Sequence, residues 1–202
     1  MFVSNNARII VSENLVLPQI ATFMNDLRQT RPEVFTHCLN VAYLVAEISL
    51  RNYNEDLYLP IGKDSIHEVV QGALLHDIGK MEIDNAVLLK HEALTENEVE
   101  EIKLHPVYGY DMVKDNPDLS DLTKDIILSH HERADGLGYP NGVKDIRNEV
   151  KLVSICDKYD ALTEHRSYRR KKDTYTAFKI IAQEQNLEDL DVLLLLASVE
   201  DK

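Results

Sequence analysis

The sequence lacks any apolar run long enough to cross a membrane. The longest such run, Val192 to Ser198, is soon followed by acidic residues, whereas a spanning helix needs about 20 apolar residues. The start of the chain has no basic stretch followed by an apolar core, so no signal peptide is expected. With two cysteines and no export signal, Cys38 and Cys156 are expected to be reduced thiols of a cytoplasmic protein without a membrane partner.

Positive charge is also scarce. Lys and Arg number 22 against 35 Asp and Glu, which gives a net charge of −13. This balance argues against binding a nucleic-acid polymer, which requires a basic face. An acidic protein still binds a phosphate ester when metals and a local basic patch reverse the field at the site. The basic run from Arg166 to Lys172 is one such patch, although Arg170 and Lys171 are better interpreted as a solvated helix end.

Internal repeats and low-complexity segments are absent as well. With 202 residues, 44% of them apolar and 28% charged, the chain is long enough for one globular domain with a core. Apolar residues recur mostly at helical spacing, which predicts a single all-α domain. We expect a short N-terminal extension over residues 1–29 and the main domain over 30–202. No receiver, PAS or GAF-like segment is expected before the domain, so regulation is expected from the N-terminal region, a partner or a parent chain.

The predicted helices follow from apolar periodicity, caps and prolines. Residues 7–12 are expected to form a short strand or an extended arm, and residues 51–63 and 133–148 are expected to be loops. The secondary structure of residues 82–93 is not predicted. Val34, Cys38, Val41, Leu44, Val45 and Ile48 give one helix an apolar stripe. The first two expected helices cover 15–28 and Pro32 to 50. The next is capped by Asp64 or Ser65 and ends at a left-handed Gly79, and another starts at the capping box of Thr95 and is kinked or divided at Pro106. Further helices are expected over 120–131, 149–164, 173–185 and 187–199.

Residues 130–140, with the sequence HHERADGLGYP, combine metal-type ligands with turn residues. Imidazole and carboxylate bind Zn, Fe, Ni and Cu, and carboxylate also suits Mn. The glycines permit tight turns, and Pro140 restricts Tyr139 to extended conformations. By itself the stretch is equally compatible with a ligand pair at a helix end and with a helix that frays into an ordinary surface turn.

A second pair of metal-type residues stands in HDIGK, at His76 and Asp77. Adjacent helical side chains diverge by about 100°, so such a pair does not easily chelate one ion. At a helix end, however, one residue can bind one metal while its neighbour bridges to another. Further candidates are Glu33 and His37, four apart on one helical face, His105 before a proline, and Asp157 within a helix. His67, His91 and His165 are better interpreted as surface or satisfied core groups.

Together the patterns HHExxDGxGYP and HDxGK resemble the HD-GYP family, a branch of the HD-domain metal-dependent phosphohydrolases. The resemblance covers roughly residues 30–173 and includes a His-Pro-x-x-Gly unit at His105. It implies that two or three divalent ions, iron or manganese first and zinc as an alternative, hold a bridging hydroxide for attack on a phosphodiester. The implied ligands are His37, His76, Asp77 as the bridge, His105, His130, His131 and Asp157, with Glu33 for a third ion.

By the same resemblance the substrate is cyclic di-GMP, cleaved to linear pGpG; whether the product is pGpG or GMP stays open. Lys80, one turn after the HD pair, is expected to reach a phosphate oxygen; the alternative is a helix-end cation stabilised by the helix dipole. The Gly-Tyr-Pro segment is expected to shape the purine pocket or to dock a partner such as a diguanylate cyclase. The implied substrate contacts are Lys80, Asp160, Arg166, Arg169, Gly138, Tyr139 and Pro140.

The chain departs from the family pattern at two places. It lacks the proline of a DRPYR-like segment at Ser167, which affects loop rigidity, and a proline usual after HDxGK is absent where residues 81–84 stand. Two other functions remain open from the sequence. One is hydrolysis of another cyclic dinucleotide such as cyclic GMP-AMP. The other is a catalytically weak interaction module, although such modules typically lose metal ligands and none is lost here.

Overall fold

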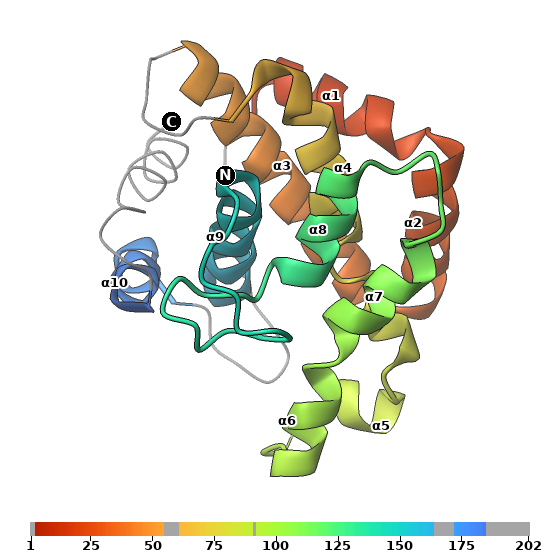
Figure 1. The fold of residues 1–202 in the computed structure, drawn as a ribbon, viewed down its shortest axis with the longest axis vertical. Coiled ribbons are helices and arrows are strands. Elements are labelled where there is room, and N and C mark those ends of the chain that lie inside the picture. Colours follow the sequence, from red (N-terminus) through yellow and green to blue (C-terminus); the bar gives the residue numbers. More distant parts are fainter. Residues whose placement is uncertain (1–2, 55–60, 91, 164–171, 185–202) are drawn as a thin grey trace.

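The computed structural model describes residues 3–54, 61–90, 92–163 and 172–184, and in these segments every regular element is a helix (Figure 1). The predicted all-α class is therefore confirmed. The expected helix over 187–199 lies outside the described residues. In chain order the elements are α1 (Asn5–Leu15), α2 (Pro18–Thr30), α3 (Pro32–Asn54), η1 (Lys63–Ser65), α4 (Ile66–Leu75), η2 (Ile78–Glu82), α5 (Asn85–Leu88), α6 (Glu96–Ile102), α7 (His105–Val113), α8 (Asp121–Ser129), α9 (Asn148–Thr163) and α10 (Thr174–Glu184).

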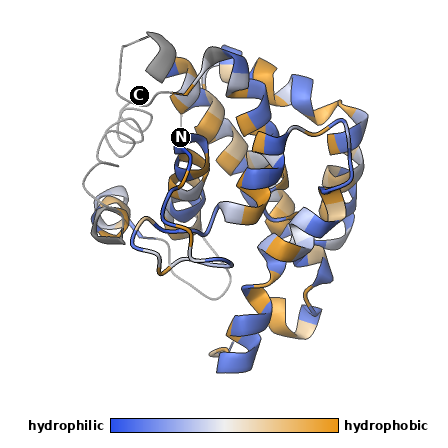
Figure 2. Cartoon of the chain, viewed as in Figure 1, coloured by the Kyte–Doolittle hydropathy of each residue, from blue (hydrophilic) through white to orange (hydrophobic). Residues whose placement is uncertain are grey.

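Helix α3 forms the centre of the bundle and packs against α1, α2, α4 and α9. The predicted apolar stripe is what it buries, since Cys38, Val41, Leu44, Val45 and Ile48 belong to the core and Val34 packs partly against it. Figure 2 shows apolar and polar residues interspersed along the helices, as expected where one face of each helix is buried. No helix in the described part of the chain is both long and apolar enough to cross a membrane.

The N-terminal residues 7–12 are helical, so the expected strand or extended arm was wrong. Ser4 caps α1 by accepting a hydrogen bond from the amide of Ala7 at 3.3 Å. Ala7 and Val11 lie four apart on one helical face and are fully buried in the core. The β-branched residues in this stretch favour a strand by propensity, but the cap and the burial of one helical face outweigh that preference.

Helix α4 ends at Leu75, earlier than the predicted end at Gly79. His76 and Asp77 follow, and the chain continues as the 3₁₀ helix η2. Gly79 has no left-handed backbone; among the described glycines only Gly136 and Gly142 have positive φ. A Cβ at Gly79 would instead collide with the backbone carbonyl of His105. The glycine is therefore needed for the close approach of η2 to α7, which brings His105 beside the HD pair.

The remaining helix starts agree with their sequence signals. The capping box at Thr95 opens α6, and α7 begins at His105, so the chain is divided at Pro106 as predicted. The segment left open, residues 82–93, contains the short helix α5. The predicted helices 120–131, 149–164 and 173–185 correspond to α8, α9 and α10. Ser65 occupies the N-cap position of α4, but its hydroxyl bonds to the carbonyl of Gly62 and makes no capping bond.

Candidate metal centre

Five segments bring seven candidate ligands to one place inside the bundle. The first histidine comes from α3, the HD pair from the end of α4, one histidine from the start of α7, the histidine pair from the end of α8 and one aspartate from α9. All except His131, which is partly buried, are nearly or fully removed from solvent. The structure thus juxtaposes His37, His76, Asp77, His105, His130, His131 and Asp157; their role as ligands stays a prediction.

The ligand atoms form two groups of three. Nitrogen or oxygen atoms of His37, His76 and Asp157 lie within 4.8 Å of one another, and so do those of His105, His130 and His131. Three donors leave room for further ligands around each ion, as in sites that do chemistry. Each group could hold a metal ion, and the number of ions stays a prediction.

Asp77 lies between the two groups. Its Oδ2 is 3.6 Å from Nε2 of His37 and 3.5 Å from Nε2 of His76, in the first group. Its Oδ1 is 3.2 Å from Nε2 of His105, in the second group. One carboxylate oxygen therefore faces each group, and the role of Asp77 as a bridging ligand stays a prediction.

Three histidines are oriented by backbone carbonyls. Nδ1 of His76 donates to the carbonyl of Ala73 at 2.8 Å, and Nδ1 of His105 donates to Ile102 at 2.7 Å. His130 donates likewise to Ile127 at 3.0 Å. A carbonyl only accepts, so the proton resides on Nδ1 and the lone pair of each Nε2 is directed into the cluster. Such partners commonly orient metal-binding histidines.

Two atoms of the cluster are buried without a hydrogen-bond partner among the described residues, Nε2 of His76 and Oδ1 of Asp77. Buried polar atoms are almost always paired, because an unpaired one costs about 1–3 kcal/mol. A divalent ion at the first ligand group would satisfy Nε2 of His76, and one at the second group would satisfy Oδ1 of Asp77. Imidazole nitrogens and carboxylate oxygens without thiolate fit iron, manganese or zinc. Cys38 also lies near His76 and Asp77, but burial raises the pKa of its thiol well above the usual range and disfavours the thiolate that metals bind.

The electrostatics keep most of the ligands in their metal-binding forms. Burial lowers the pKa of His76, lowers that of His130 far below its usual value, and brings that of His131 to about 3, so these rings are neutral at pH 7. Burial would raise the pKa of Asp77, but the charge of Lys80, with Nζ 2.6 Å from Oδ2, holds it well below the usual range. Asp77 is therefore ionised.

His37 is held between two carboxylates. Its Nε2 is 2.9 Å from Oδ1 of Asp157, and its Nδ1 donates to Oδ2 of Asp160 at 2.6 Å. Burial would lower the pKa of His37, but these hydrogen bonds and the charges of Asp157 and Asp77 raise it to about 9. A metal would displace the proton on Nε2, while Asp160 keeps the one on Nδ1. Asp160, predicted to contact substrate, thus orients a ligand as well as lining the adjacent cavity.

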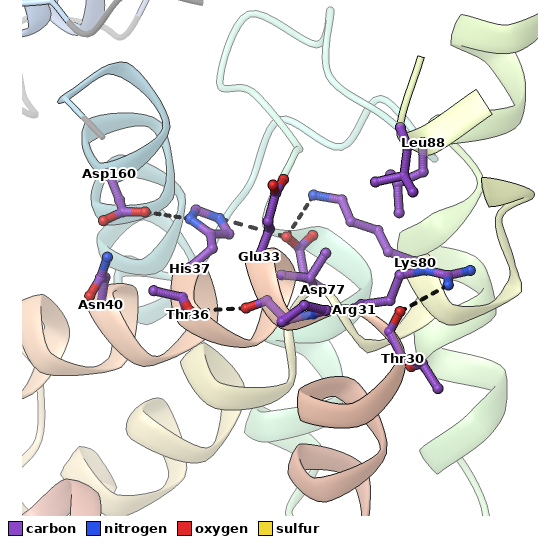
Figure 3. Close-up of a pocket in the computed structure, with 13 residues that line it drawn as sticks. Thr30, Arg31, Glu33, Thr36, His37, Asn40, Asp77, Lys80, Leu88 and Asp160 are labelled. Carbon is purple, nitrogen blue, oxygen red and sulfur yellow. Dashed lines mark hydrogen bonds and ion pairs between the residues drawn. The ribbon is translucent and has the colours of Figure 1, made fainter. Parts of the chain in front are cut away.

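A cavity of about 490 Å³ opens beside the first ligand group (Figure 3). Its walls include His37, Asp77 and Lys80. Glu33 also lines it and is exposed, one turn before His37 on α3, but it is not among the grouped ligand atoms. Its predicted role as ligand of a third ion stays a prediction.

The Gly-Tyr-Pro loop packs on the second ligand group. The ring of Tyr139 stacks on His131 with centroids 4.7 Å apart, and a Cβ at Gly138 would collide with the backbone of Glu132 and Arg133. Pro140 is partly buried. None of the three motif residues Gly138, Tyr139 and Pro140 lines the 490 Å³ cavity, and their role as substrate contacts stays a prediction. Arg166 and Arg169 lie outside the described residues.

Sequence reasoning assigned no role to Glu132, which anchors this loop. Its carboxylate accepts hydrogen bonds from the amides of Asn141 at 2.7 Å and Val143 at 2.9 Å, and the residue is only 3% exposed. The sequence signal that could have drawn attention to Glu132 is its position directly after the histidine pair. The carboxylate holds the far side of the loop against the end of α8, and thereby fixes Tyr139 on His131.

We expect Glu132→Ala to destabilise the protein by about 1–3 kcal/mol, because two loop amides lose a buried acceptor. Thermal unfolding monitored by circular dichroism measures this. Glu149→Ala, which removes the same side chain from the first turn of α9, is the matched control and should change stability little. An unchanged unfolding temperature in Glu132→Ala would show that the loop does not depend on this anchor.

Comparison with known proteins agrees with the geometry. The family model described as HD domain matches residues 44–192. A cyclic di-GMP phosphodiesterase of Pseudomonas aeruginosa is 33% identical over 159 residues, which are 78% of this chain and 37% of that protein. One of Thermotoga maritima is 31% identical over 167 residues, 81% of this chain and 44% of that protein. The chain thus spans less than half the length of these curated relatives.

Among solved structures, a protein of Bdellovibrio bacteriovorus described as HDG"Y"P superposes with a TM-score of 0.65 at 21% identity, covering 82% of this chain and 52% of that one. The fold and the site define a helical protein with a histidine- and aspartate-rich centre that could hold divalent metal. The chain belongs to the HD-domain family and, by its two motifs, to the HD-GYP branch of it.

Proposed function

We propose that this chain is a metal-dependent phosphodiesterase that hydrolyses cyclic di-GMP to pGpG or to GMP. The observation that carries the proposal is the position of Asp77, with one carboxylate oxygen toward each of two ligand groups. The names of the relatives support the substrate. The cytoplasmic location and a signalling partner at the Gly-Tyr-Pro loop remain predictions from the sequence.

The metals are proposed to be iron or manganese, with zinc as the alternative. Glu33 is proposed as a ligand of a third ion. When bound, two such ions lower the pKa of a water molecule and neutralise charge on the phosphodiester. The protein would hold them through its histidines and its ionised aspartates in a buried site, where electrostatic interactions are strong. Lys80 lines the cavity beside Asp77 and is proposed to contact a phosphate oxygen of the substrate.

The test combines metal analysis of the purified protein with chromatography of the products formed from cyclic di-GMP and from cyclic GMP-AMP. We expect two or three equivalents of metal and conversion of cyclic di-GMP to pGpG or GMP. Faster conversion of cyclic GMP-AMP than of cyclic di-GMP would identify cyclic GMP-AMP as the substrate instead. Bound metal without hydrolysis of either nucleotide would contradict the proposed function.

Arg166 is proposed as a donor to the substrate, because a cyclic dinucleotide carries a second phosphate and two bases that the metals do not bind. A lost charge-assisted hydrogen bond costs about 1.5–3 kcal/mol, so Arg166→Ala should lower kcat/KM by roughly 10- to 150-fold at unchanged metal content. Arg170→Ala, in the same basic run, is the control and should keep wild-type kinetics. Wild-type kinetics in both variants would mean that the basic run from Arg166 to Lys172 is only a solvated helix end.

A further inference from the structure

The cavity beside the metal centre has a second end that the metal chemistry does not use. One end is formed by His37 and Asp77, and the other by Arg31 at the junction of α2 and α3 together with Leu88 and Leu89 at the end of α5. A volume of about 490 Å³ is within the range of small-molecule sites, roughly 300–1,000 Å³. The far end therefore offers space for a part of the ligand beyond the phosphate at the metals.

The guanidinium of Arg31 is fixed in place but retains free donors. Its Nη1 donates to the carbonyl of Thr30 at 3.2 Å and its Nη2 to the carbonyl of Ile83 at 3.0 Å. These bonds use two of the five N–H donors of an arginine, and Nε is buried without a hydrogen-bond partner in the described structure. Figure 3 shows the side chain extending away from His37. A donor group that is already oriented loses little entropy when it binds a ligand.

The surroundings favour a base over a second phosphate at this end. Beside Arg31, the far end is formed by the apolar side chains of Leu88 and Leu89. An anionic phosphate would lose its hydration against these two side chains, which offer it no hydrogen-bond donor.

A neutral base with hydrogen-bond acceptors meets no such penalty. Leu88 and Leu89 supply apolar surface for its face, and Leu89 is 56% exposed, so this surface is accessible to a ligand.

Among purines, guanine matches the donors of an arginine. Its O6 and N7 are adjacent acceptors that a guanidinium binds with two parallel hydrogen bonds, whereas adenine presents a donor at the corresponding edge. We propose that Arg31 binds the O6/N7 edge of a guanine base of the cyclic dinucleotide held at the metal centre, and so selects guanine over adenine. This inference rests on the proposed function and adds the residue that reads the base.

The experiment measures kcat/KM for cyclic di-GMP, cyclic di-AMP and bis(p-nitrophenyl) phosphate, a phosphodiester without a purine. Arg31→Ala should lower the value for cyclic di-GMP about 5- to 150-fold and leave the other two unchanged. Arg31→Lys keeps the charge and a donor for the carbonyl of Ile83 but lacks the fork, so it should lose the guanine preference too. Arg28→Ala, an exposed position in the last turn of α2 outside the cavity lining, is the control. Metal content and unfolding temperature are recorded for each variant.

The outcomes separate this inference from the proposed function. Unchanged preference for cyclic di-GMP in Arg31→Lys and Arg31→Ala overturns the inference alone. If the Arg31 variants lose kcat/KM equally for cyclic di-GMP and cyclic di-AMP but not for bis(p-nitrophenyl) phosphate, the inference is also overturned. Arg31 would then be assigned to the second phosphate. A wild-type protein that cleaves bis(p-nitrophenyl) phosphate but neither cyclic dinucleotide refutes the proposed function itself, and the inference with it.

Discussion

Asp77→Asn is expected to reduce kcat/KM on cyclic di-GMP by about 10³-fold or more. Asp77 is 1% exposed and directs one oxygen to His37 and His76 and the other to His105. The amide has nearly the same shape but only one oxygen and no charge, so it cannot join two cations. Metal-ion catalysis contributes several kcal/mol of transition-state stabilisation, and about 4 kcal/mol corresponds to 10³-fold in rate.

Metal quantification should accompany these kinetics. We expect less metal per chain in Asp77→Asn, because two ions at close range repel without the bridging charge. Asp111→Asn, which changes the same group at an exposed position of α7 where the carboxylate pairs with Lys114, should keep both metal and activity. Full activity with a full complement of metal in Asp77→Asn would exclude the bridging role.

Removal of metal is expected to lower the unfolding temperature by about 8–16 °C. A ligand present at about 1,000 times its dissociation constant stabilises the folded state by about 4 kcal/mol, and for a chain of this size each kcal/mol corresponds to roughly 2–4 °C. The structural reason lies in the cluster itself. Within the part of the chain that the structure describes, Nε2 of His76 and Oδ1 of Asp77 are buried without hydrogen-bond partners, and His130 and Asp157 beside them are also buried.

The measurement is thermal unfolding with saturating manganese and after exhaustive chelation. The Asp77→Asn variant serves as the control, because its weakened site should give a smaller difference between the two conditions. Equal unfolding temperatures of the wild type with and without metal would mean that the cluster is stable as a purely hydrogen-bonded group, and would contradict the metal assignment.

The sequence alone determined the identity of the candidate ligands and most of the helices. The ligands occur as local patterns, such as HDIGK and HHERADGLGYP, whose residue types are uncommon together. Helix starts depend on signals within a few residues, such as the capping box at Thr95 and Pro32 at the first turn of α3. Local signals of this kind are readable because the interactions they describe join residues close in the chain.

The tertiary structure decided what depends on contacts between distant segments. Asp160 orients His37 across 123 residues of chain, and Arg31 reaches both the carbonyl of Ile83 and the cavity. Residues 7–12 are helical although their local propensity favours a strand, because burial of one face of the helix in the core stabilises it. Gly79 marks a close approach to the backbone of α7 and not a helix end. None of these has a local signature, because each arises from packing and hydrogen bonding that exist only once the helices have assembled.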